Sequence, residues 1–259
     1  MSKKHFDVSR FWKTMERIAL VATIIGAFVG VLAWLGANPY VKLSKKTDKG
    51  LVSIQQKCDA SSAEVSKMDP TEVPQEVMQV HQMMLEMKND YQLVNKYIKH
   101  KKEISRRKYL KSLSTVELVK LAIDERKVSG TLIRESLMPS ISKIDEPSNQ
   151  LDEKVSAIYK MNHKKLYDES KVVYKKMLDW QTEMKEIDVE LNDYMKRFNP
   201  YNNQNKPERK LFKICKKVIY AKKEVKSLKE WCKYIEMYVD YLSELQEYYI
   251  QNQSNKKLN

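Results

Sequence analysis

Residues 211–242 read LFKICKKVIYAKKEVKSLKEWCKYIEMYVDYL, and this stretch decides the fold class. Its apolar side chains recur at alternating intervals of three and four residues, which is typical of the buried seam of a coiled coil or helical bundle. Ten seam positions follow one another without interruption and predict one continuous helix: Leu211, Ile214, Val218, Ala221, Val225, Leu228, Cys232, Ile235, Val239 and Leu242.

Two earlier stretches repeat this spacing, from Val77 to Ile98 and from Val173 to Phe198. The seven prolines fall between the predicted helices, where proline is tolerated. Ser114 and Glu117 form a sequence capping box that predicts a new helix start. We therefore expect an all-α protein with a linker over 38–73, a helical region over 74–147 (a long helix over 74–112 plus shorter helices), an antiparallel helical hairpin over 148–252 with its turn at 199–207, and a disordered tail over 253–259.

The charge distribution predicts how the two arms of the hairpin meet. Residues 177–195 hold six acids and one base, whereas residues 206–229 hold ten bases and two acids. Folding back at the Asn-rich turn places the two blocks side by side, and opposite charges along a seam favour that orientation. Each exposed pair contributes only a few tenths of a kcal/mol, about 0.2–1, so the seam supplies stability and the charges select the register.

The sequence IALVATIIGAFVGVLAWLGA, residues 18–37, contains no charged side chain over twenty positions. A helix of that length spans roughly 30 Å, the thickness of the hydrocarbon core of a bilayer. A cleaved signal peptide is the main alternative, but its apolar region is normally about 7–15 residues. We predict a single transmembrane helix after a basic tail of residues 1–17, with Trp12, Trp34 and Tyr40 as aromatic anchors at the membrane interface.

Ala22, Gly26 and Gly30 stand four residues apart inside this segment. Rows of small residues allow two helix backbones to approach closely in lipid, so the row predicts self-association. The flanks hold five basic residues on each side and leave the topology open under the positive-inside rule. Three cysteines without metal-like spacing favour a reducing compartment, and hence a cell-membrane protein with a cytoplasmic C-terminal domain.

Composition argues against an enzyme. The chain has only five glycines, three of them inside residues 18–37, and it lacks the glycine-rich loops that hold phosphates or nucleophiles. Its four histidines form no metal-binding motif. We expect no catalytic residue, no cofactor and no metal.

The net charge of +14 makes the basic stretches of the chain candidates for binding an anionic partner. The candidate anionic-partner patch is Lys99, Lys101, Lys102, Arg106, Arg107 and Lys108, and a second basic block covers residues 206–229. Membrane lipid, another acidic partner, nucleic acid, or plain solvation of a helix face are the alternatives.

Two functions remain in view. The first is a single-pass membrane-anchored coiled-coil scaffold, tether or signal-coupling protein that acts through contacts with copies of itself or with other helical proteins. The second is a membrane-acting effector of the toxin or defence type, which oligomerises and perturbs the bilayer. The absence of charge in residues 18–37 disfavours a water-filled pore.

Overall fold

The computed structural model describes residues 38–69, 73–142, 157–197 and 209–258. The chain divides into two units, Met1–Asn38 and Pro39–Asn259, and the description below concerns the second. Within the described residues every regular element is a helix, so the all-α prediction and the helical bundle are confirmed. In chain order the elements are α2 (Pro39–Ser66), α3 (Gln75–Ile104), α4 (Arg107–Ser112), α5 (Thr115–Leu132), the π-helical turn η1 (Ile133–Leu137), α6 (Met138–Ser142), α7 (Ala157–Arg197), α8 (Arg209–Ile219) and α9 (Lys222–Leu258).

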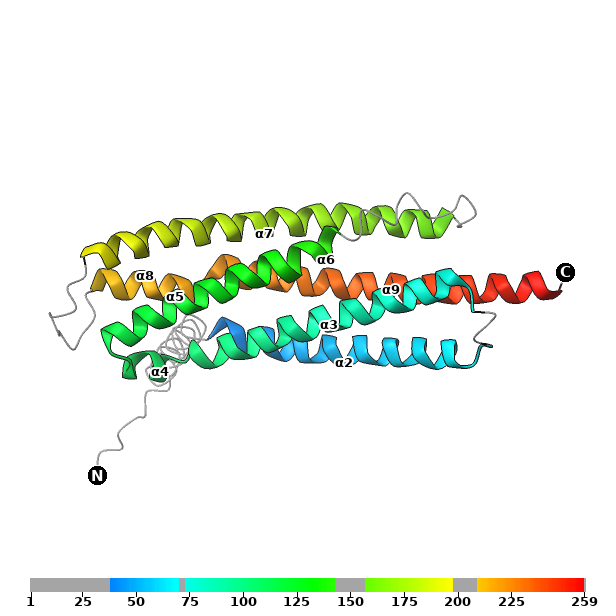
Figure 1. The fold of residues 1–259 in the computed structure, drawn as a ribbon, viewed down its shortest axis with the longest axis horizontal. Coiled ribbons are helices and arrows are strands. Elements are labelled where there is room, and N and C mark those ends of the chain that lie inside the picture. The colour runs from blue at the N-terminus through cyan, green and yellow to red at the C-terminus, as the bar shows by residue number, and fades with distance from the viewer. Residues whose placement is uncertain (1–37, 70–72, 143–156, 198–208, 259) are drawn as a thin grey trace, which may run out of the picture. The chain divides into compact units, whose positions relative to one another are not determined.

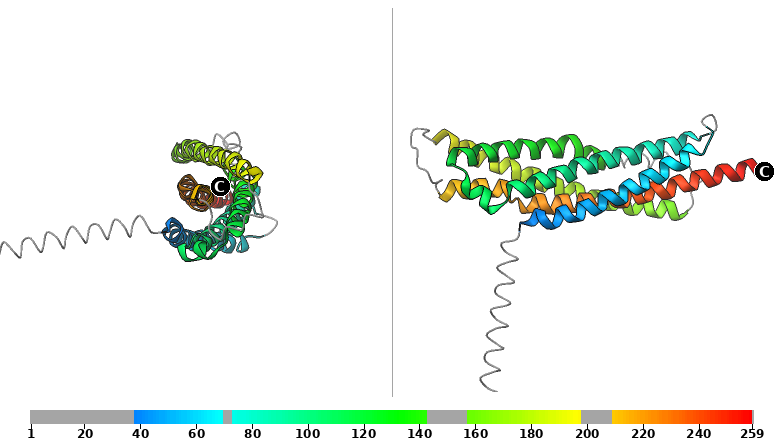
Figure 2. Two further views of the ribbon diagram at one scale, coloured as in Figure 1. Left: turned by 90° about the vertical axis from the view of Figure 1, so that its left-hand side faces the viewer. Right: turned by 90° about the horizontal axis from the view of Figure 1, so that it is seen from below.

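The long helix α9 occupies the middle of the bundle, where α2, α3 and α7 all pack against it (Figure 1). Helix α2 runs parallel to α9, because Tyr40 contacts Glu224 and, further along both helices, Lys57 contacts Asp240. In the end view of Figure 2, α8 and α9 lie between α2 and α7. Burial on several sides explains why α9 carries large side chains such as Trp231, which is fully buried.

Helix α7 runs antiparallel to α8 and α9. Lys217 of α8 contacts Glu190 of α7, and further along α9 Lys233 contacts Glu169. Lys176 and Glu230 form a third pair at 3.2 Å, in which α7 supplies the base and α9 supplies the acid. The seam residues of both arms from Val173 to Leu191 and from Leu211 to Leu242 are buried, apart from the partly buried Val225.

Helix α2 replaces most of the expected linker over 38–73. Gly50, within the expected linker, lies inside this helix. A Cβ atom at this position would lie 2.9 Å from Tyr91 Cζ and would also overlap the Tyr91 hydroxyl and Glu236 Oε1. The glycine therefore serves the close approach of α3 and α9 to α2, which is a tertiary requirement and not a turn signal.

The predicted helix over 74–112 is interrupted at Ser105 and Arg106, where α3 ends and α4 begins. The Ser105 hydroxyl donates to the Lys101 carbonyl at 2.5 Å, while the Ser105 carbonyl accepts from the Tyr220 hydroxyl at 2.5 Å. A hydroxyl bonded back to the preceding turn competes with helix continuation. The capping box predicted at Ser114 and Glu117 is present at the start of α5.

The last predicted helix is interrupted as well. Helix α8 ends at Ile219 and α9 begins at Lys222, although the seam passes over the junction without a change of register. At the other end, α9 continues to Leu258 and includes most of the tail expected to be disordered. Residues 253–258 contain no glycine or proline, and extending an existing helix adds one hydrogen bond per residue fixed.

None of the helices in the described ranges is long and apolar enough to cross a membrane. The predicted span over 18–37 and the predicted turn over 199–207 both lie outside those ranges. Helix α8 begins at Arg209, two residues after the end of the predicted turn.

Candidate functional site

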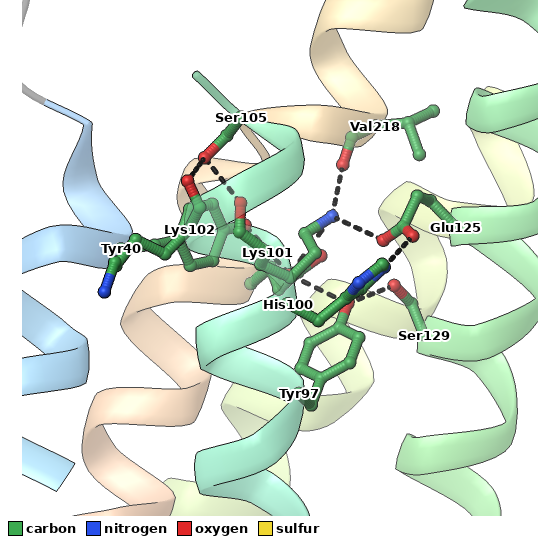
Figure 3. Close-up of polar contacts among 10 residues, drawn as sticks. Tyr40, Tyr97, His100, Lys101, Lys102, Ser105, Glu125, Ser129 and Val218 are labelled. Atoms are coloured by element: carbon green, nitrogen blue, oxygen red, sulfur yellow. Dashed lines mark hydrogen bonds and ion pairs between the residues drawn. The ribbon is translucent and has the colours of Figure 1, made fainter. Parts of the chain in front are cut away.

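A buried lysine marks the most unusual position in the bundle. Lys101, in the last turn of α3, has 0% of its side chain exposed. Its ammonium nitrogen donates to the Val218 carbonyl at 3.1 Å and lies 3.5 Å from a carboxylate oxygen of Glu125 and 3.5 Å from one of Glu224 (Figure 3). Because an uncompensated buried charge is very costly, a lysine survives here only through several partners at once.

The Val218 carbonyl is available because α8 and α9 are separate helices. In a continuous helix this oxygen would accept the amide of residue 222, four positions later. Here α9 starts at Lys222, and the first hydrogen bonds of the new helix include Val225 N to Ala221 O. The interruption thus supplies an acceptor for the lysine, and the lysine satisfies a carbonyl that the interruption leaves open.

Glu224, in the first turn of α9, is fully buried and receives two phenol hydrogen bonds. Tyr40 donates to its Oε1 atom at 2.8 Å, and Tyr97 donates to the same atom at 2.9 Å. Since the single Tyr97 proton is used in this way, the Ser129 hydroxyl must donate to the Tyr97 oxygen, 2.5 Å away. Burial raises the pKa of Glu224, while Lys101 and the two phenols oppose that rise.

Glu125 of α5 completes the cluster. Its Oε1 atom lies 2.6 Å from Nε2 of His100, whose side chain is 50% exposed, and its Oε2 atom faces Lys101. We name the set of Tyr40, Tyr97, His100, Lys101, Glu125, Ser129 and Glu224 the ionic cluster. It joins α2, α3, α5 and α9 directly and reaches α8 through the Val218 carbonyl (Figure 3).

The two carboxylates outnumber the single buried ammonium. In addition, the Oε2 atom of Glu224 is buried and has no hydrogen-bond partner among the described residues. The cluster therefore has the capacity to hold one further proton on Glu224, whose pKa burial raises. The hollow along α7 and the hollow between α7 and α8 are lined by residues outside the cluster.

Nothing in the described part of the chain gathers three or more metal-ligating side chains. The three cysteines are free and buried, and burial raises the pKa of the Cys215 thiol to about 12. A thiol of this kind is inert unless the surrounding helices open. One hollow of about 350 Å³ lies between α7 and α8, but Glu190 and Asp193 line it together with Lys210, Lys213 and Lys217, which reduces its attraction for an anion.

Tyr40, predicted as an aromatic anchor at the membrane interface, lies with its ring inside the bundle. Its side chain is 0% exposed and its hydroxyl bonds to Glu224. The remaining predicted membrane residues, Trp12, Trp34 and the self-association row Ala22, Gly26 and Gly30, lie outside the described residues.

The predicted anionic-partner patch is divided by the fold. Lys101 points into the bundle and cannot contact a partner. Lys99 contacts Asp48 at 2.7 Å, and Arg106 contacts Glu103 at 2.6 Å, with Lys102 3.8 Å from Glu103. Lys108 is exposed, and the side chain of Arg107 lies outside the description. These nearby acids reduce the charge that the patch offers to a ligand.

The sequence contained a signal for the ionic cluster. The seam of α3 continues from Ile98 to Lys101 with the expected spacing, and Glu125 stands in the buried row Leu118, Ala122, Glu125, Ser129 and Leu132. A charged residue at a seam position predicts either a polar partner or an interruption of the seam.

No protein-family model, curated protein or solved structure matches this chain.

Proposed function

We propose that this protein is a single-pass membrane protein whose helical bundle acts as a scaffold or tether and couples the membrane segment to protein partners. The proposal combines the predicted span over 18–37 with one observation, the complete burial of Tyr40 beside Glu224. Tyr40 is the second residue of α2, so the first turn of the helix that follows residue 38 is tied to the ionic cluster.

This attachment gives the proposal a physical mechanism. A displacement or rotation imposed on the chain before Pro39 acts on Tyr40, and the hydrogen bond to Glu224 passes it to the start of α9. Lys101 connects the same point with the end of α8. Packed helices with buried polar contacts change arrangement in discrete steps, so such a junction is suited to signal coupling.

The first experiment tests the anchor. Full-length protein expressed in cells is washed with alkaline carbonate, and the membrane potential is followed with a dye. The proposal predicts that the protein stays with the membrane pellet and that the potential is unchanged. Release by carbonate removes the anchor, whereas depolarisation on expression would favour the effector that perturbs the bilayer.

The second experiment tests the coupling. Hydrogen exchange is measured for the full chain in lipid nanodiscs, with and without Gly26→Ile and Gly30→Ile, which should disrupt the predicted self-association. Coupling predicts altered exchange at the amides around the α8–α9 junction. Tyr40→Phe removes the hydroxyl donor to Glu224 and should abolish that response. A passive tether shows the same exchange at the junction with and without the two glycine substitutions.

A further inference from the structure

Helices α8 and α9 carry a concentration of exposed lysines at one end of the bundle. Eight of them are solvent-exposed: Lys210, Lys213, Lys216, Lys217, Lys222, Lys223, Lys226 and Lys229. Among the ion pairs of the described residues, Lys217 contacts Glu190, and the other seven lysines have no carboxylate partner. This differs from the region of Lys99 to Arg106, where acidic neighbours reduce the charge.

Three of these lysines form a row on α9. Lys222, Lys226 and Lys229 follow one another at intervals of four and three residues, so they lie on one side of the helix. Contacts on both sides locate the row. Toward α7, Lys176 contacts Glu230 next to Lys229, and toward α2, Lys57 contacts Asp240 further along α9.

The first turns of α2 add basic residues beside this row. Lys42 and Lys46 are exposed and stand four positions apart on the parallel neighbour of α9. We name Lys42, Lys46, Lys222, Lys226 and Lys229 the lysine face. The acids close to it are engaged elsewhere, since Glu230 contacts Lys176, Asp48 contacts Lys99, and Tyr91 donates to Glu236 at 2.6 Å.

The lysine face begins three residues after Pro39, where α2 starts directly behind the predicted span. At 1.5 Å per residue, Lys42 and Lys46 lie roughly 5–10 Å along the helix from that point, within about one Debye length at physiological salt. We propose that the lysine face docks on the anionic phospholipid headgroups of the membrane that residues 18–37 cross. The inference rests on the proposed function for the presence of that bilayer.

Lipid phosphates suit this surface better than nucleic acid does. The basic side chains are spread over two parallel helices without an element placed to read bases, and the chain itself keeps them next to the membrane. Each lysine near an anionic bilayer strengthens association about fivefold, equivalent to about 1 kcal/mol. The five lysines together would hold the bundle with its α2–α9 side against the membrane.

The test uses the full chain reconstituted in vesicles of phosphatidylcholine alone or with about one third phosphatidylserine, an amount chosen to give a clearly negative surface. Lysines are acetylated with an amine reagent, and the rate at each site is read by mass spectrometry. Docking predicts slower acetylation of Lys222, Lys226 and Lys229 on the anionic vesicles than on the neutral ones, because an ammonium held against a headgroup is less accessible to the reagent. Lys164 and Lys165 are exposed near the start of α7, away from the lysine face. They are the internal controls, and their acetylation rates should not change.

A matched pair of variants separates a specific face from general attraction. Lys222→Gln with Lys226→Gln should weaken docking about 25-fold, the product of two fivefold effects, and restore the acetylation of Lys229. Lys164→Gln with Lys165→Gln removes the same charge and should leave the protection intact. Raising the salt to about 1 M, where the Debye length falls to about 3 Å, should also remove the protection.

Several results would overturn the inference. Equal acetylation rates on neutral and anionic vesicles exclude docking on lipid, as does protection of the same lysines only when duplex DNA is added to neutral vesicles. Failure of the anchor is recognised separately, because the chain would then not stay with neutral vesicles after a carbonate wash. In that case flotation with anionic vesicles, lost in the Lys222 and Lys226 variant, would still support the lysine face.

Discussion

Replacing Lys101 by methionine tests whether the ionic cluster holds the bundle together. Methionine has a similar length and fills the same space, but it leaves Glu125 and Glu224 facing each other without the ammonium that lies 3.5 Å from each. It also removes the donor to the Val218 carbonyl. Breaking a buried ion pair by removing one partner costs about 3–5 kcal/mol, because the remaining charge stays buried and uncompensated. That is a large part of the roughly 5–15 kcal/mol that stabilises a typical domain.

The assay is guanidinium unfolding of the full chain followed by circular dichroism, with two comparison variants. Lys102→Met changes the neighbouring lysine, whose side chain is 32% exposed and 3.8 Å from Glu103, and it should cost no more than about 1 kcal/mol. Lys101→Met combined with Glu224→Gln removes an ammonium and one of the opposed carboxylates together. Its cost should fall below the sum of the single changes by about 1–3 kcal/mol, the range found for residues in one network.

Two outcomes would refute this reasoning. The first is a loss for Lys101→Met as small as that for Lys102→Met, which would mean that the cluster does not control stability. The second is additive behaviour of Lys101→Met and Glu224→Gln, which would mean that the two side chains do not interact. A Lys101→Met protein with intact helix content but freely reactive Cys215 would locate the damage at α8, where Val218 loses its partner.

Three further predictions concern Glu224, Gly50 and Ser114. Because the pKa of Glu224 is raised in the folded protein, the folded state binds more protons than the unfolded state between the two pKa values. The contribution of Glu224 protonation to the free energy of unfolding is therefore complete below the ordinary pKa of a glutamate, near 4.5, and is lost as the pH rises through the pKa of the folded state. Glu224→Gln should flatten that part of the stability–pH curve, as urea midpoints at a series of pH values will show, and an unchanged slope would contradict the assignment. Gly50→Ala should destabilise the bundle by about 1–3 kcal/mol because its Cβ overlaps Tyr91 and Glu236, and Tyr91→Phe, which removes the overlapping hydroxyl, should recover part of that loss in thermal unfolding. Ser114→Ala removes the capping oxygen of α5 and should cost about 1 kcal/mol in the same measurement, whereas Ser112→Ala, just outside the cap, should be nearly neutral.

Hydrophobic spacing predicted the fold class and the buried faces of the long helices, because one stripe per helix must find a partner. It failed over residues 39–66 because α2 is held by polar and small side chains as much as by apolar ones. Thr47 donates to Asn95 at 2.8 Å, and Asn95 donates to Asp48 at 3.0 Å, so hydrogen bonds contribute to the contact with α3 beside the buried apolar side chains of α2. Such a network leaves no periodic apolar signal in the sequence.

The candidate site could be predicted in part. A lysine at the seam position after Ile98 indicates that something charged faces it, but the sequence does not say which carboxylates do so. Glu125 and Glu224 are 24 and 123 residues away along the chain, and α2 and α3 bring Tyr40 and Tyr97 to the same point. The basic run from Lys99 to Lys108 looked like a uniform surface patch because its charge is visible in the sequence, whereas the partners that allow Lys101 to be buried are visible only in the tertiary structure.

The interruption between α8 and α9 explains why the seam alone was misleading. The spacing of apolar residues reports the phase of a helix. At Ala221 this phase is unchanged, although the backbone hydrogen bonds of a continuous helix are interrupted there. The cause lies on another helix, where the ammonium of Lys101 takes the Val218 carbonyl that a continuous helix would use internally. The lysine and the interruption therefore require each other: without the open carbonyl the ammonium lacks an acceptor, and without the ammonium the carbonyl would be buried unsatisfied. It follows that Lys101→Met, by removing the competitor, should favour closure of the junction into one continuous helix, and the exchange rates of the amides at Tyr220 to Lys222 are the place to detect it.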